Sequence, residues 1–390
     1  MTLFRNTLAA KLGQPCGDRV QRRVKYLPAF IIKPASGACQ YRCEYCFYAD
    51  VMNNRAVSNY GSMTFNTLEA LVKRAMSYAE GSVSFAFQGG EPTLVGLDFY
   101  KELMRLEKKH NRGLQVFNSI QTNGGLINDE WAMFLKENHF LVGLSLDGAK
   151  TLHDKYRKNA SGEGTYEKTL ETARLFEKYG VDFNILCVVN DDIASNPIET
   201  YEAIRQFRFL QFIPCIDDFD LDKRMFSPSP ENYGRFLIET FKLYLRDIQK
   251  GEYVSVRAFD NYVQMLKGRR PESCSMTGRC TCYFVIEGNG DVYPCDFYVL
   301  DKWKLGNVLD NDFRSMLKSE RAEEFVSSSV YMHPDCRACR HYSLCRGGCR
   351  RDREPFDDMN RPGKTRYCQS YKMFFEACGD DLRALARSIR

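Results

Sequence analysis

Three cysteines stand at short spacing near the amino end of the chain, in the order Cys39, Cys43 and Cys46. They follow an apolar run that predicts a strand, 28–34, so their thiols lie in one loop and can face one metal centre. A structural zinc ion normally takes four protein ligands. A [4Fe–4S] cluster held by three cysteines keeps one iron open for an outside ligand. The spacing favours the cluster, and a zinc knuckle that takes its fourth ligand from elsewhere is the alternative.

A second group of cysteines fills the region from 274 to 368, which has little apolar periodicity. A segment so poor in core-forming residues usually needs metal to hold it together. One dense run begins at Cys336, and the other lies around a hairpin-like turn, Glu287–Asp291. Iron–sulfur clusters or a pair of structural zinc sites both fit this pattern. The clustered cysteines are Cys274, Cys280, Cys282, Cys295, Cys336, Cys339, Cys345, Cys349 and Cys368.

Polar residues follow the other predicted strands where these end. Gly90 lies in a Gly-Gly turn that allows close backbone approach to a ligand, and Glu91 beside it can accept hydrogen bonds from an ammonium group. Ser145 and Asp147 offer a hydroxyl and a carboxylate to ribose hydroxyls. Arg157 can pair with a carboxylate through its planar guanidinium. Each is compatible with an ordinary turn, but their shared placement at strand ends indicates one ligand site.

The elements that position these residues repeat one unit of strand, turn and amphipathic helix up to residue 216. Six such units favour an open, partial (β/α)6 barrel of the TIM type, with function at the carboxyl ends of its strands. Thr64 and Asn128 are expected helix caps. The predicted strands are 28–34, 83–88, 114–121, 140–147, 181–189 and 207–216. The predicted helices are 65–79, 98–110, 129–138, 166–179 and 197–206, followed by 228–250 and 257–267.

The composition excludes several classes of protein. With 390 residues, 44% of them hydrophobic, the chain can bury a large core, which excludes global disorder. No apolar run is long enough for a bilayer span, so no membrane is expected. The net charge of +5 gives no reason to expect nucleic acid as a partner. Residues 1–25 show no apolar stretch of the secretory kind, and the 16 cysteines then indicate metal or redox sites in a reducing cytoplasm.

The first cysteine motif, followed by an aromatic residue after the first strand, resembles the signature of radical S-adenosylmethionine (SAM) enzymes. The cysteine-rich region resembles the SPASM domain, which carries two auxiliary [4Fe–4S] clusters. Four longer segments, 84–93, 117–124, 183–189 and 293–303, look like those of anaerobic sulfatase-maturating enzymes. This resemblance covers about residues 28–371 and implies three [4Fe–4S] clusters and SAM as cofactors.

The resemblance also implies roles for individual residues. Asp296 is the expected general base that takes a proton from the substrate. Tyr48 and Gln88 are further candidates, expected to contact the substrate peptide. Tyr45 and Ile216 lie near adenine. The implied SAM ligands are Gly90, Glu91, Ser145 and Arg157. The implied cluster ligands are Cys39, Cys43 and Cys46 for the SAM cluster, Cys274, Cys280, Cys295 and Cys349 for the first auxiliary cluster, and Cys336, Cys339, Cys345 and Cys368 for the second. Cys282 stays ambiguous because it lies two residues from an implied ligand.

The implied function is oxidation of a cysteine or serine in a sulfatase to Cα-formylglycine. The implied partners are a sulfatase polypeptide with a Cys/Ser-x-Pro-x-Arg motif and an electron donor such as flavodoxin or ferredoxin. One alternative is a SPASM peptide maturase that forms thioether or carbon–carbon crosslinks. Another is a non-catalytic iron–sulfur electron carrier, which needs no SAM site. The expected domains are an extension at 1–25, the barrel at 26–230, linker helices at 231–273, the SPASM domain at 274–378 and a tail at 379–390.

Overall fold

The computed structural model describes residues 29–219, 226–353, 356–357 and 361–389. The expected extension at 1–25, with Cys16, and Pro28 at the start of the first predicted strand lie outside these residues. In the described part of the chain, no helix combines the length and the apolar character needed to cross a bilayer.

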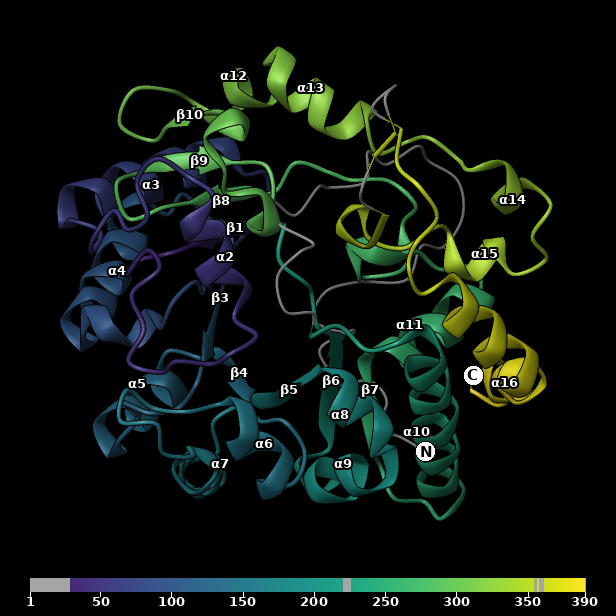
Figure 1. Ribbon diagram of the computed structural model, residues 1–390. Coiled ribbons are helices and arrows are strands. Elements are labelled where there is room, and N and C mark those ends of the chain that lie inside the picture. The colour runs from purple at the N-terminus through teal and green to yellow at the C-terminus, as the bar shows by residue number, and fades with distance from the viewer. Residues whose placement is uncertain (1–28, 220–225, 354–355, 358–360, 390) are drawn as a thin grey trace.

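The six predicted strands are confirmed and lie side by side in parallel, in chain order (Figure 1). Their alternate side chains are fully buried, as at Phe30, Phe85 and Ile185, and pack into the main core. Because all six run the same way, their carboxyl ends meet at one edge, where the loops carry the polar residues. The strands are β1 (Ala29–Ile32), β2 (Ser82–Phe87), β3 (Gln115–Thr122), β4 (Leu141–Ser145), β5 (Phe183–Val189) and β6 (Phe209–Pro214).

Helices cover the outer side of these strands, whereas α2 lies on the inner side, next to β1 (Figure 1). Thr64 and Asn128 cap two of them as predicted, because their side chains accept hydrogen bonds from the backbone N–H groups of Thr67 and Trp131. The sequence predictions did not include α2, α6 and α8. The helices are α2 (Phe47–Asn53), α3 (Phe65–Tyr78), α4 (Leu97–His110), α5 (Asp129–Glu137), α6 (Lys150–Tyr156), α7 (Tyr166–Tyr179), α8 (Asp191–Ser195) and α9 (Pro197–Ile204).

The cysteine-rich region adds strands to the same sheet. Its hairpin of β8 (Phe284–Ile286) and β9 (Asp291–Tyr293) lies along β1, with β8 parallel to it, and β10 (Gly306–Asn307) follows. A short strand, β7 (Ser255–Val256), extends the other end beside β6, so the described residues form a ten-stranded sheet. The hairpin brings the segment after β9 close to the loop after β1.

Three later helices pack together beside β6 and β7: α10 (Pro230–Gln249), α11 (Arg257–Leu266) and α16 (Cys368–Ser388) (Figure 1). The sequence analysis did not predict α16, and the domain boundary expected at residue 378 falls inside it. Phe374, Leu382 and their helical neighbours bury one face of α16 in the main core. Residues 379–388 therefore continue a packed helix. The remaining short helices are α12 (Phe313–Leu317), α13 (Glu320–Ser327), α14 (Pro334–Arg337) and α15 (Tyr342–Cys345).

Candidate active site

The loop between β1 and α2 carries Cys39, Cys43 and Cys46, all half-buried. The pKa of the Cys39 thiol is raised to about 12 and that of Cys43 to about 11. Burial is the main cause, and the neighbouring thiols contribute to both shifts. Three thiols held this close to one another do not ionise readily without a compensating positive charge. The loop therefore suits a metal centre, whose binding drives thiol deprotonation.

The turn after β2 packs directly against this cysteine loop. The N–H of Glu91 donates to the carbonyl of Ala38 at 2.7 Å. Gly90 has φ +51°, and a Cβ placed there would lie 2.1 Å from the same Ala38 oxygen. Only glycine fits this contact. The turn after β2 thus approaches the cysteine loop closely through its backbone, and the expected close approach to a ligand stays a prediction.

The Glu91 side chain is buried between the ends of β2 and β3. Its Oε1 accepts hydrogen bonds from the backbone N–H and hydroxyl of Thr93 and from the hydroxyl of Thr122, while Oε2 accepts from the backbone N–H of Asn123 at 2.8 Å. Burial raises the pKa of Glu91, and these donors oppose that effect. The carboxylate joins the ends of β2 and β3. Oε2 keeps acceptor capacity for one further donor.

Arg157 and Asp147 form a buried pair at the end of β4. The Nε of Arg157 donates to Asp147 Oδ2 at 2.7 Å, and the guanidinium lies over the Tyr45 ring at 5.5 Å. Asp147 also accepts hydrogen bonds from Tyr45 and from the backbone N–H of Val188. Both carboxylate oxygens of Asp147 therefore accept hydrogen bonds from protein groups, whereas the sequence led us to expect a contact with ribose. Ser145 nearby accepts a hydrogen bond from Gln121 at 3.0 Å.

Tyr45 and Ile216 approach the end of β6 from two sides. Tyr45 packs with Tyr156 and with Cys215, the residue before Ile216. Ile216 is half-buried and lines a hollow of about 180 Å³ together with Phe47 and other residues from three parts of the chain. The remaining lining residues are Asp50, Val51, Asp217, Phe219, Phe297 and Arg351.

Asp296 lies in this region, at the start of the turn after β9. Its Oδ2 accepts a hydrogen bond from the Tyr48 hydroxyl at 2.6 Å and another from the Gln88 amide at 2.9 Å. Its Oδ1 is buried and accepts no hydrogen bond within the structure. Burial raises the pKa of Asp296, opposed by the positive charge of Lys33 and by the Tyr48 hydrogen bond. One carboxylate oxygen is thus held by the protein, and the other has no donor among the residues that the structure describes.

A buried ion network beside Asp296 was not found by the sequence analysis. Lys33 and Arg55 both pair with Glu287 Oε1, at 2.9 and 2.7 Å, and all three side chains are at most 1% exposed. Burial would raise the pKa of Glu287, but the two cations outweigh it and hold the pKa at about 2. The Lys33 ammonium also lies 4.7 Å from the centre of the Tyr48 ring. The sequence signal was a lysine that ends an apolar strand.

The first auxiliary set, defined as Cys274, Cys280, Cys295 and Cys349, comes together in space from four separate segments. Burial raises the pKa of the Cys349 thiol, and the nearby Cys295 and Cys274 add to it. Burial also raises the pKa of the Cys295 thiol, and the nearby Cys274 and Cys280 contribute to this shift. Cys282 lies in an apolar cluster with Tyr298, Trp303 and Phe325, against which Cys280 and Cys295 of this set also pack. Its thiol donates to the Ala322 carbonyl.

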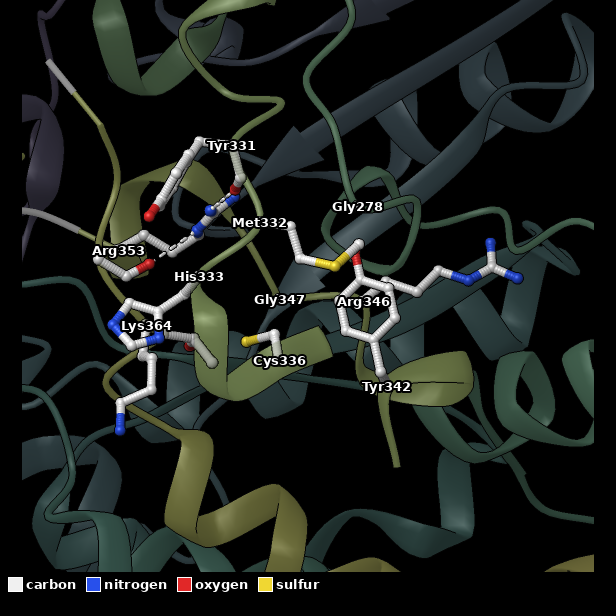
Figure 2. A pocket seen from close by; sticks show the side chains of 12 residues that line it. Gly278, Tyr331, Met332, His333, Cys336, Tyr342, Arg346, Gly347, Arg353 and Lys364 are labelled. Atoms are coloured by element: carbon white, nitrogen blue, oxygen red, sulfur yellow. Dashed lines mark hydrogen bonds between the residues drawn. The ribbon is translucent and has the colours of Figure 1, made fainter. Parts of the chain in front are cut away.

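The second auxiliary set, defined as Cys336, Cys339, Cys345 and Cys368, also comes together. The pKa of Cys345 is raised to about 11, mainly by burial, with contributions from Cys368, Cys336 and Cys339. Cys336 lines a hollow of about 250 Å³ with Tyr331, Tyr342 and Arg353 (Figure 2). The structure therefore brings together the same two groups of four that the resemblance implies.

The spacing within the cysteine sets bears on the zinc alternatives. Among the described residues, no three His, Cys, Asp or Glu side chains converge closely enough to hold one metal ion. A structural zinc ion needs four ligands at about 2.3 Å from one centre. An iron–sulfur cluster spreads its cysteines over several irons. The donors in all three sets are sulfur, which is the ligand of iron–sulfur clusters and, as a set of four cysteines, also of structural zinc.

Comparison with known proteins gives two family matches. Residues 34–204 match the radical SAM superfamily, and residues 274–340 match SPASM, an iron–sulfur cluster-binding domain. A solved structure described as native anSMEcpe with bound AdoMet and Cp18Cys peptide is 44% identical, with a TM-score of 0.89, and covers 94% of this chain and 100% of that one. Streptococcus suis SuiB bound to its precursor peptide SuiA, 18% identical with a TM-score of 0.62, shares the fold alone.

Curated relatives extend over nearly the whole chain. A serine-type anaerobic sulfatase-maturating enzyme of Bacteroides thetaiotaomicron is 33% identical over 89% of this chain and 88% of its own length. The cysteine-type enzyme of Clostridium novyi is 45% identical over 93% of this chain and 98% of its own. The cysteine-type enzyme of Clostridium perfringens is 46% identical over 93% of this chain and 99% of its own length. The chain thus belongs to the family of anaerobic sulfatase-maturating enzymes, which are radical SAM enzymes with a SPASM domain.

Proposed function

We propose that this chain oxidises a cysteine of a sulfatase polypeptide to Cα-formylglycine, with Asp296 as the group that takes the thiol proton. The observation that carries the proposal is the unshared, buried Oδ1 of Asp296. Tyr48 follows Cys46 by two residues, and Gln88 follows the last residue of β2, so the two donors that hold Oδ2 come from the two segments proposed to bind SAM. A substrate thiol that reaches Oδ1 therefore meets an oriented acceptor at that site.

Cysteine is the preferred substrate side chain in this proposal. Its support is the identity of 46% with a cysteine-type relative, against 33% with a serine-type relative. Oxidation removes one hydrogen atom from the substrate Cβ and then one proton and one electron. Water must afterwards replace the sulfur of the thioaldehyde, with release of hydrogen sulfide, to give the aldehyde.

Cys39, Cys43 and Cys46 would hold the [4Fe–4S] cluster to which SAM binds. When bound, the cluster and SAM supply the hydrogen-atom abstraction that no side chain can perform. The backbone at Gly90 and the free acceptor capacity of Glu91 Oε2 suit the SAM amino group. Arg157, held by Asp147, has further N–H donors for the SAM carboxylate. Glu91 and Arg157 are both oriented by buried partners.

The adenosine moiety would lie near the ends of β4 and β6. Tyr45 and Ile216 offer apolar surface to adenine, and the Ser145 hydroxyl faces Gln121 at the neighbouring strand end. The first and second auxiliary sets would each hold one further [4Fe–4S] cluster. Cys282 has no such role in the proposal, because its thiol is buried among apolar side chains.

The polypeptide substrate would carry the Cys-x-Pro-x-Arg motif, and a flavodoxin or ferredoxin would supply the electron. We place the reaction in the cytoplasm. The support is chemical: the 15 described cysteines form no disulfide, and cluster assembly needs reduced thiols.

The test is anaerobic incubation of the reconstituted full chain with SAM, dithionite and one of two peptides that differ only in Cys or Ser at the first motif position. Mass spectrometry then measures 5′-deoxyadenosine and the modified peptide. We expect an aldehyde on the Cys peptide, captured by a hydrazide, with slower turnover of the Ser peptide.

Other products would contradict the proposal. A peptide that keeps its sulfur, loses two hydrogens and resists the hydrazide would indicate a crosslinking maturase. Faster turnover of the Ser peptide would overturn the cysteine preference alone. A protein that does not bind SAM would support an iron–sulfur electron carrier.

A further inference from the structure

Arg353 is a buried cation that no carboxylate neutralises among the described residues. It is 5% exposed, and its guanidinium donates hydrogen bonds to the backbone carbonyls of Gly363 at 3.1 Å, Ser329 at 3.0 Å and Tyr331. Carbonyl oxygens orient the side chain but carry no net charge. A buried charge is costly unless opposite charge lies near it. Among the described residues, the partners of this buried positive charge are therefore neutral carbonyl groups.

Arg353 lies between the two auxiliary cysteine sets. Ser329 connects it to the first set, because the Ser329 carbonyl accepts from Arg353 while its hydroxyl accepts from the Cys280 N–H at 2.8 Å. On its other side, Arg353 lines the same hollow as Cys336 of the second set, as Figure 2 shows.

We propose that the Arg353 guanidinium is a counter-cation shared by the two auxiliary iron–sulfur clusters and raises the reduction potential of both. The proposal rests on the cysteine assignments given above and is independent of the substrate. Reduction of a cluster adds one electron and one negative charge, and a fixed cation nearby stabilises the more negative state. Arg353 would therefore make both auxiliary clusters easier to reduce, because its charge raises both reduction potentials.

Arg350 provides a matched comparison on the same turn. It is also buried, at 6% exposure, and its guanidinium lies over the rings of Tyr298, Trp303 and Phe325 at 5.0, 5.2 and 4.8 Å. These rings pack against Cys280 and Cys295 of the first set, whereas the hollow lined by Cys336 of the second set includes Arg353 and not Arg350. Arg350 is thus a cation for one set only.

The test is a dithionite titration of the reconstituted full chain, in which dithionite supplies the electrons and EPR follows each cluster. Replacement of Cys39, Cys43 and Cys46 by Ala leaves only the auxiliary signals. In this background we compare Arg353→Gln, Arg353→Lys and Arg350→Gln. Iron analysis comes first, because about eight irons per chain show that both auxiliary clusters are present.

We expect Arg353→Gln to shift both midpoint potentials to more negative values, Arg353→Lys to keep both, and Arg350→Gln to shift one. Unchanged potentials in a fully loaded Arg353→Gln protein would overturn the proposal, and so would a shift of a single cluster. If Arg353→Gln does not load iron, Arg353→Lys decides. An Arg353→Lys protein that loads iron and keeps both wild-type midpoint potentials supports the charge role. An Arg353→Lys protein that does not load iron, or whose two midpoint potentials both shift, refutes it. Low iron in the background itself would contradict the cysteine assignment instead.

Discussion

Replacement of Asp296 by Asn removes the proposed proton acceptor while it keeps the shape of the side chain. Tyr48 and Gln88 both donate to Oδ2, so the Asn oxygen must take that place and the Asn NH₂ group must replace Oδ1. The opposite orientation would leave two buried donors facing an NH₂ group, at about 1–3 kcal/mol each. The substrate thiol then meets a donor where it met an acceptor. Loss of a general base slows a reaction by about 10²- to 10⁴-fold, or about 3–5 kcal/mol of activation free energy.

The assay measures formylglycine and 5′-deoxyadenosine in the same anaerobic reaction. We expect Asp296→Asn to lose the peptide product while SAM cleavage continues, because Asp296 does not contact the proposed SAM ligands. Asp301→Asn is the control: this exposed carboxylate lies in the same segment and accepts only a backbone hydrogen bond from Ala56. The control should retain wild-type turnover. A formylglycine rate in Asp296→Asn within about threefold of wild type would refute the reasoning, because one lost decade already costs about 1.4 kcal/mol.

Three further substitutions test the site and the fold. Cys282→Ala should keep about twelve irons per chain, whereas Cys349→Ala should lose about four; equal losses in an iron assay would return Cys282 to the ligands. Gly90→Ala places a Cβ 2.1 Å from the Ala38 oxygen at a φ of +51°. The strain of about 1–3 kcal/mol should weaken SAM binding about tenfold or more in equilibrium dialysis, with an unchanged circular dichroism spectrum; undiminished binding would place SAM elsewhere. Burial raises the pKa of Glu107 from 4.5 to about 7, so the folded state holds more protons than the unfolded state between these values and stability falls as pH rises through them. Glu107→Gln should remove this loss of about 2–3 kcal/mol in the free energy of unfolding. Urea unfolding at pH 5 and pH 8 measures the loss, and an equal loss of stability between the two pH values in both proteins would contradict the prediction.

The sheet was predictable because its strands are near-continuous apolar runs between turn residues. The predicted strand 181–189 became β5, which begins two residues later at Phe183, and the caps Thr64 and Asn128 fixed two helix starts. Helix α16 was missed, although Phe374, Leu382 and their neighbours have helical spacing.

Contacts between distant segments were not predictable from the pattern. Arg55 and Glu287 are 232 residues apart and meet only because β8 pairs with β1. A three-residue strand carries too little apolar pattern to specify its partner. In the same way, Arg157 has the chemistry of a ligand-binding cation in the sequence, but its pairing with Asp147 is visible only in the structure.

The position of β1 between β2 and β8 limits how this chain can be divided. Excision of everything after residue 273 would strip β1 along one side and expose the backbone N–H and C=O groups that now bond to Phe284–Ile286. A bare, apolar edge of this kind recruits other chains. A truncated barrel should therefore precipitate, and any chimaera between relatives must exchange the hairpin and the strand it covers as one piece.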